Sequence, residues 1–172
     1  MQPILAIHKS SLRSINIRCL DLPGIDGLDL RDFENLEELS LSDQLTNGTT
    51  DVDLIGNLLA PRLRVFCWDM TLEDQQLSEK LGDFEQKEED WLRTLAREAV
   101  SQGCPLRRID IIFTPYDTYL FDGIYPWDRM DALARELQPH GIQVTYNPPS
   151  TSREEYMEIL NRTMKKRNRN RE

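Results

Sequence analysis

The sequence predicts an α/β fold in which about five short parallel strands alternate with helices and stack as a solenoid. Three observations predict it: an apolar pattern recurs along the chain, helical stripes lie between its copies, and the apolar content is modest. The 172 residues suit one domain. Their apolar share is about 41% when Gly is counted and Tyr is not, below the roughly 45–50% usual for globular domains, which favours a thin, layered core.

The recurring pattern has apolar residues at its first, fourth and sixth positions, as in Leu36, Leu39 and Leu41. Three more copies occupy residues 12–17, 63–68 and 106–111, and a weaker fifth occupies 141–144, where Ile142 and Val144 match the last two positions. Measured at the fourth position, the copies lie 24, 27, 43 and 33 residues apart. A period of this size is typical of a repeat architecture, in which each unit buries its apolar side against its neighbours.

Helical apolar stripes separate the predicted strands. They occupy residues 52–59, 91–100, 130–137 and 156–160. Thr50 or Asp51 caps the first helix, and Gly103 follows the second. Ser152 and Glu155 form a capping box before the last, which we expect to act as a C-terminal capping helix.

Strands that alternate with helices at short intervals require right-handed crossovers and a parallel sheet. The apolar positions of the pattern then face the helices, and the intervening positions stand on an open, concave face. We predict that this face binds a protein partner through two rows of side chains. The first row is Asn16, Ser40, Cys67, Asp110 and Gln143. The second row is Arg18, Ser42, Asp69, Ile112 and Thr145, with Glu38, Val65 and Arg108 flanking both.

The pattern resembles a leucine-rich-repeat domain, and more narrowly the C-terminal repeat region of fungal F-box-type proteins. The phrases that carry the resemblance are SLRSI at 11–15, FENLEELSL at 33–41, PRLRVF at 61–66, PWDRM at 126–130, GI at 141–142 and TYNPP at 145–149. Family repeats place Asn or Cys at the ninth position, whereas this chain has Leu20, Gln44, Thr71 and Thr114 there. We therefore expect an irregular solenoid over residues 1–161.

The resemblance implies a non-catalytic interaction module that recognises substrates for a ubiquitin ligase. The segment that binds the ligase adaptor in F-box proteins has no counterpart in these residues, so that role is not carried over. The first predicted strand, Ile15 to Arg18, would form a sheet edge. We hypothesise that further repeats preceding it, or self-association, cover this edge.

The charge is uneven along the chain. Residues 162–172 hold six bases and one acid, which leaves 15 bases and 29 acids in residues 1–161. A body this acidic repels phosphate backbones, so nucleic acid is disfavoured as its main ligand. We interpret 162–172 as a basic disordered tail, and an alternative function is that of a nuclear factor directed by this tail.

The remaining features indicate an intracellular protein, cytoplasmic or nuclear. No apolar run reaches the roughly 18 residues of a membrane span, and the amino terminus lacks a secretory apolar region. Three widely spaced cysteines do not form a disulfide framework or a zinc pattern, and we expect no metal and no cofactor.

The segment 114–127 has neither helical nor strand periodicity and is rich in aromatic residues. Such excursions are often binding elements, and Tyr anchors many interfaces. We predict partner contacts from Tyr116, Tyr119, Phe121 and Tyr125. A second alternative is a hydrolase-like enzyme that uses the acidic residues in and beside this loop, Asp117, Asp122 and Asp128.

Overall fold

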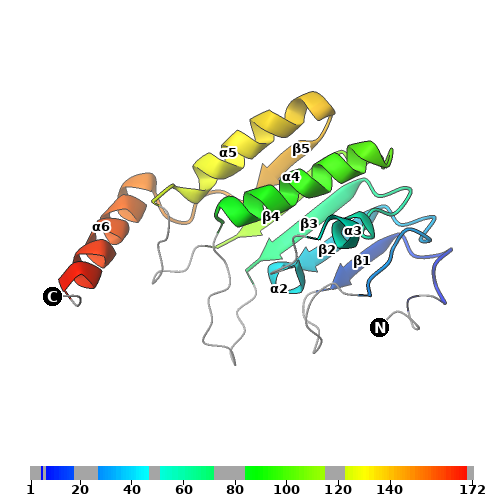
Figure 1. The fold of residues 1–172 in the computed structure, drawn as a ribbon, viewed down its shortest axis with the longest axis horizontal. Helices are drawn as coiled ribbons and strands as arrows, with labels where there is room; N and C mark the ends of the chain where they lie inside the picture. The colour runs from blue at the N-terminus through cyan, green and yellow to red at the C-terminus, as the bar shows by residue number, and fades with distance from the viewer. Residues whose placement is uncertain are drawn as a thin grey trace.

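The protein is described by a computed structural model (Figure 1) that covers residues 5, 7–17, 27–46, 51–71, 84–114 and 123–169, with the side chains of 44, 45 and 163–169 left out. The described strands form one five-stranded sheet. They are β1 (Ser14–Ile17), β2 (Glu38–Ser42), β3 (Val65–Met70), β4 (Arg108–Phe113) and β5 (Gln143–Tyr146). Every pair is parallel, and the spatial order β1-β2-β3-β4-β5 is the order along the chain. The predicted α/β class and parallel sheet are confirmed.

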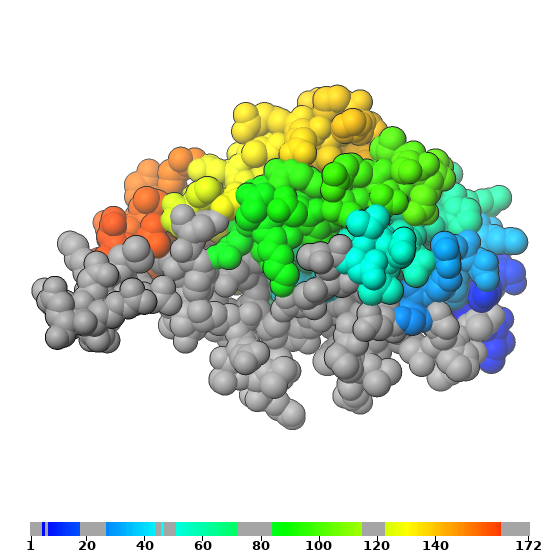
Figure 2. Space-filling model, in the orientation of Figure 1, coloured from blue at the N-terminus to red at the C-terminus, as the bar shows by residue number. Residues whose placement is uncertain are grey.

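The crossover helices lie on one face of this sheet. Parallel strands joined in sequence order by crossovers of one hand place each connection on the same side. Figure 1 shows α3 (Val52–Gly56), α4 (Gln86–Ser101) and α5 (Pro126–Leu137) in front of the strands. The space-filling view shows these helices side by side as a continuous layer (Figure 2). The opposite side of the sheet is called the open face below.

The core lies between the sheet and this helical layer. The fourth positions of the first four copies of the pattern share one register row that continues to β5, and all its members are buried. The row is Ile15, Leu39, Phe66, Ile109 and Val144. Leu36, Leu63 and Leu106, at the first position, are also buried. The alternation of the pattern therefore assigns the inward face correctly.

The predicted register of the fifth strand is wrong by two residues. Val144 pairs with Ile109, so Val144 and not Ile142 occupies the fourth position of the pattern. Thr145 consequently lies beside Asp110, and Gln143 lies beside Arg108. A strand repeats every two residues, so a shift of two keeps each side chain on its face and leaves the alternation unchanged.

Helix α3 begins where the sequence predicts, whereas α4 and α5 begin four or five residues before their predicted apolar stripes. Asp51 caps α3, its side chain accepting a hydrogen bond from the Asp53 amide at 2.9 Å. The stripe at 91–100 lies in α4, although Val100 is 55% exposed. Helix α5 begins at Pro126, so the segment 114–127 is shorter as a loop than predicted. Gly141, with a φ of 76°, follows the short 3₁₀ helix η1 (Gln138–His140) and turns the chain into β5.

The C-terminal helix α6 (Arg153–Arg169) differs from the prediction in length and place. Its capping box is confirmed: the Ser152 amide donates to Glu155 Oε2 at 3.0 Å, and the Glu155 amide donates to Ser152 Oγ at 3.2 Å. The helix runs to Arg169, so it continues into the segment expected to be a disordered tail from residue 162. It lies beyond the amino end of α5 and does not cover β5 (Figure 1).

The pairing beside the carboxyl end of β4 is continued by the side chain of Asn147. The Phe113 amide donates to Asn147 Oδ1 at 2.6 Å, and Asn147 Nδ2 donates to the Phe113 carbonyl at 2.7 Å. The Asn147 side chain thus takes the part of a peptide group beside β4. The Asn147 carbonyl accepts from Trp127 Nε1 at 3.0 Å, which ties this turn to α5.

Candidate functional site

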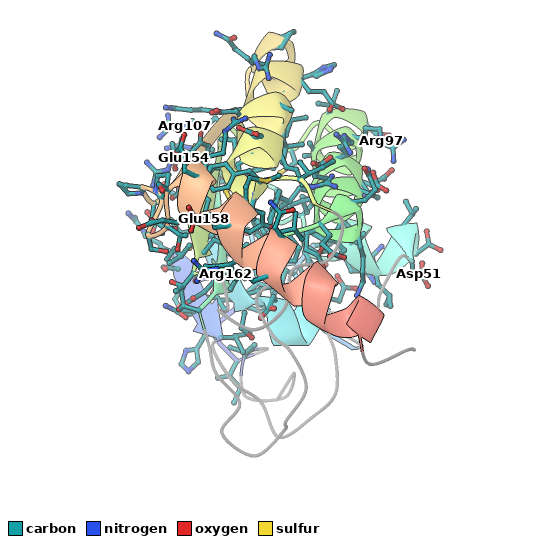
Figure 3. The ribbon with its side chains drawn as sticks, turned by 90° about the vertical axis from the view of Figure 1, so that its left-hand side faces the viewer. Asp51, Arg97, Arg107, Glu154, Glu158 and Arg162 are labelled. Carbon is teal, nitrogen blue, oxygen red and sulfur yellow. The ribbon has the colours of Figure 1, made fainter. Side chains whose placement is uncertain are left out.

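The open face presents three register rows of side chains from neighbouring strands. The central row is Asn16, Ser40, Cys67, Asp110 and Thr145. The flanking row, toward the amino ends of the strands, is Ser14, Glu38, Val65, Arg108 and Gln143. The third row, toward the carboxyl ends, includes Ser42, Asp69 and Ile112. Figure 3 views the molecule along the sheet, with Arg107 on the sheet side and Arg97 on the helix side.

A small polar cluster lies on β4 and β5, at one end of this face. Arg108 Nε donates to Asp110 Oδ2 at 3.0 Å, and their side chains are 46% and 26% exposed. Thr145 Oγ1 donates to the other carboxylate oxygen of Asp110. Both carboxylate oxygens of Asp110 therefore accept a hydrogen bond, and these bonds fix the positions of the carboxylate and of the Arg108 guanidinium. Such an arrangement can accept and donate hydrogen bonds to a partner without rearranging.

Cys67 lies beside this cluster and is half-buried. Burial raises the pKa of its thiol, a hydrogen bond with Ser40 opposes the shift, and the charge of Asp110 adds to it. The thiol is consequently protonated at neutral pH, and a protonated thiol is a poor nucleophile. Cys67 thus fits a packing and contact role rather than covalent chemistry.

Two of the three described residues of the third row are buried. Ser42 is fully buried and Asp69 is 3% exposed, so neither side chain, both predicted to contact a partner, is accessible on this face. Asp69 Oδ1 accepts hydrogen bonds from the Thr71 amide at 3.0 Å and from Thr71 Oγ1 at 2.6 Å, which makes it a turn residue at the end of β3. Ile112 is 39% exposed on the same row. Arg18 lies outside the described residues.

Of the four predicted contact residues in the segment 114–127, only Tyr125 is described, and its side chain is internal. Tyr125 is 8% exposed, donates its hydroxyl to the Thr151 carbonyl at 2.7 Å, and packs on Trp127 and Tyr156. Burial raises the pKa of Tyr125, with the nearby charge of Asp128 adding to the shift. Tyr125, predicted to contact a partner, is therefore a packing residue whose side chain is not accessible in this structure. Tyr116, Tyr119 and Phe121 lie outside the described residues.

The acidic residues considered for catalysis are also largely outside this description. Asp117 and Asp122 are not covered, and Asp128 forms an ion pair with Arg153 of α6. Among the covered residues, no group of three or more His, Cys, Asp and Glu side chains is placed to hold a metal ion. Within the same ranges, no helix has both the length and the apolar character of a membrane span.

Two features of the structure escaped the sequence reasoning. The first is the cluster of Arg108, Asp110 and Thr145. Arg108 and Asp110 are two residues apart on one strand, so the alternation alone could have predicted their contact. The contact with Thr145 could not be predicted, because the expected register of β5 was wrong by two residues. The second feature is a network between α4 and α5: Glu89 bonds Arg129 at 3.0 Å and Arg93 at 2.9 Å, while Arg93 also bonds Glu136 at 2.8 Å. Glu89 and Arg93 are four residues apart on α4, but the two links to α5 join residues about forty apart along the chain, and no local signal predicts those links.

Comparison with known proteins gives no relative for this fold and face. No family model, no curated protein and no solved structure matches the chain. The inference about function therefore rests on the sheet, its open face and the residues on it.

Proposed function

We propose that this chain is a protein–protein interaction module, an irregular leucine-rich-repeat-like solenoid whose open face binds another protein. The observation that carries the proposal is the sheet itself: parallel strands in chain order, with α3, α4 and α5 on one side. Repeat folds use the uncovered side of such an array as an extended binding surface. Here the central and flanking rows offer that surface at accessible or half-buried positions, including Asn16, Glu38 and Arg108.

The chemistry of these rows suits a protein partner. Glu38 and Asp110 oppose Arg108 in sign, while Val65 and Cys67 add partly buried apolar area between them. Protein interfaces combine such apolar area with hydrogen-bonding groups, and Arg is enriched in them. A phosphate backbone would instead call for a surface of one positive sign, and the chain carries a net charge of −9.

The finer proposal concerns the biological setting. The resemblance of residues 11–15, 33–41 and 61–66 to the repeats of fungal F-box-type proteins supports a role in recognising substrates of a ubiquitin ligase inside the cell. The parallel order of the strands agrees with that resemblance. On this proposal the open face binds the protein to be ubiquitinated, and the ligase adaptor binds elsewhere.

Site-specific crosslinking tests the face. A photo-crosslinking residue at position 16 lies on the open face, in the central register row. One at position 97 lies on the helix side (Figure 3). In extract from the source cells, we expect a discrete adduct from position 16 and none from position 97. The Arg108→Glu variant should abolish this adduct, whereas Arg97→Glu, which makes the same change in charge on α4, should preserve it.

Three outcomes would contradict the proposal: no adduct from position 16, an adduct from position 97 alone, or equal loss with Arg97→Glu and Arg108→Glu. The ubiquitin-ligase setting has its own test. The crosslinked protein should persist longer in cells that lack the chain, and an unchanged lifetime would contradict substrate recognition while leaving the binding face intact.

A further inference from the structure

The outer edge of β5 borders a groove that none of the functions above uses. The groove has a volume of about 780 Å³ and lies between the last strand and α5. The described residues that line it are Asp131, Ala134, Arg135, Gln138, Gly141, Ile142, Gln143 and Val144. It occupies the position where a sixth strand and its helix would continue the array.

The backbone along this edge is available for pairing. The Gln143 amide donates to the Arg107 carbonyl at 2.9 Å, and Gln143 pairs with Arg108, so Gln143 and Thr145 direct their peptide groups toward β4. In a parallel ladder the alternate residues direct theirs the other way. The N–H and C=O groups of Val144 therefore point away from β4, in the plane of the sheet, toward the groove.

The helix that follows β5 leaves this edge uncovered. Helix α6 packs at the other end of α5: the Tyr156 hydroxyl donates to the Ile124 carbonyl at 3.2 Å, and Leu160 lies within 3.6 Å of where a Cβ on Gly123 would stand. Figure 1 shows α6 beyond the carboxyl ends of the strands, away from β5. Sheet edges of this kind are sites of strand addition.

We propose that a second copy of this chain occupies the groove, with β5 of one copy antiparallel to β5 of the other about a twofold axis near Val144. An axis perpendicular to the sheet keeps the helices of both copies on the same side and joins the two sheets into one. Val144 then faces its own symmetry mate and exchanges both backbone hydrogen bonds with it.

The charges along α5 favour this self-pairing. Asp131 and Arg135 lie one helical turn apart on the wall of the groove, with Ala134 between them. Within the chain, the Asp131 carboxylate accepts a hydrogen bond from the Tyr146 hydroxyl and Arg135 Nε donates to the Asp131 carbonyl at 3.2 Å. The twofold axis makes the two α5 helices antiparallel, so Asp131 of each copy faces the part of the other helix that carries Arg135. Ala134 is small and lets the helices approach. A surface that carries its own complement is the signature of an isologous interface.

The test is the mass of the full chain in solution, by sedimentation velocity and light scattering from about 1 to 100 µM protein. We expect a concentration-dependent dimer. Arg135→Glu places like charges across the axis and should raise the dissociation constant about tenfold. Arg97→Glu is the matched control on α4 and should leave it unchanged. The swap Asp131→Lys with Arg135→Glu should restore association.

A second variant reads the backbone directly. Val144→Pro removes an amide that points away from β4, so it should abolish dimerisation while circular dichroism still shows the folded chain. A monomer at every concentration, a dimer insensitive to Arg135→Glu and Val144→Pro, or an open-ended series of larger species that pairs β5 with β1 would overturn the proposal. None of these results bears on the crosslinking at position 16, so the two proposals fail independently.

Discussion

The Glu89–Arg129 ion pair between α4 and α5 is deeply buried, and its removal should be costly. Arg129 Nη1 lies 3.0 Å from Glu89 Oε1, with the two side chains 7% and 5% exposed. Arg129→Met keeps the volume and removes the charge. It leaves the Glu89 carboxylate buried, still paired with Arg93 at 2.9 Å.

The surviving Arg93 contact sets the expected magnitude. Breaking a buried pair from one side costs about 3–5 kcal/mol, and the partner that Glu89 retains places Arg129→Met near the lower limit, about 3 kcal/mol. The double variant Arg129→Met with Glu89→Met removes both charges of the pair, so neither remains buried without its partner. Because a buried pair is often no more stable than apolar residues of similar size, we expect the double variant to lie within about 1 kcal/mol of the parent chain.

Urea unfolding followed by tryptophan fluorescence measures all four free energies of the double-mutant cycle. The reasoning requires that the second substitution rescue the first, so that the two effects are far from additive. A cost below about 1 kcal/mol for Arg129→Met, or a double variant as unstable as the sum of the single ones, would refute it.

Three further predictions address the sheet and its edges. Ile109→Ala, at a fully buried site in the middle of β4, should lower the free energy of unfolding by about 4 kcal/mol in the same assay, and a loss under about 2 would contradict its place in the core. Gly141→Ala should cost about 1–2 kcal/mol through its φ of 76° alone, because no atom lies within 4 Å of the added Cβ; an unchanged midpoint would contradict this conformation. Partial burial, with the hydrogen bond to Asp131 adding to its effect, raises the pKa of Tyr146 to about 12. Its folded pKa lies above the unfolded value of 10.0, so its contribution to stability is complete below pH 10 and is lost as the pH rises toward 12. Phenolate absorbance should show a step near pH 12 that Tyr146→Phe removes; if Tyr146→Phe instead removes a step near pH 10, the raised pKa is contradicted.

The sequence was most informative where apolar residues alternate without interruption. Leu39, Phe66 and Ile109 align because each belongs to a full copy of the pattern, with a Leu three residues earlier. At β5 the Leu is replaced by Gly141, so nothing marked the start of the copy and the register shifted by two. The alternation of apolar residues predicts which face of the sheet a side chain lies on. Its position along the strand is predicted only where a marker residue, here the Leu at the first position, fixes the start of the copy.

Burial on the open face could not be predicted in the same way. Ser42 and Asp69 alternate correctly with the inward residues, yet both are buried. Alternation states which way a side chain points and carries no information about what else covers that side. Val100 shows the converse on α4, where a residue with helical spacing lies on the flank of the stripe and stays exposed.

Helix α6 was under-predicted because basic residues were treated as a sign of disorder. The chain there also places Glu158 four residues before Arg162, and the two side chains form an ion pair at 3.1 Å along the helix. Such pairs stabilise exposed helices. Charge composition alone therefore underestimates the extent of a helix in which an acid and a base lie four residues apart.

The single-sided helical layer has a geometrical consequence for the shape of the sheet. Neighbouring strands sit about 4.8 Å apart, whereas packed helices need about 8–10 Å. The strand spacing and the helix spacing can both be satisfied only if the sheet is curved, with the strands on the inner, concave side and the helices on the outer, convex side. Helix α4 has 16 residues and α3 has five, so we expect the crowding of the helices, and the curvature it imposes, to be strongest beside α4 and α5 and to decrease toward β1.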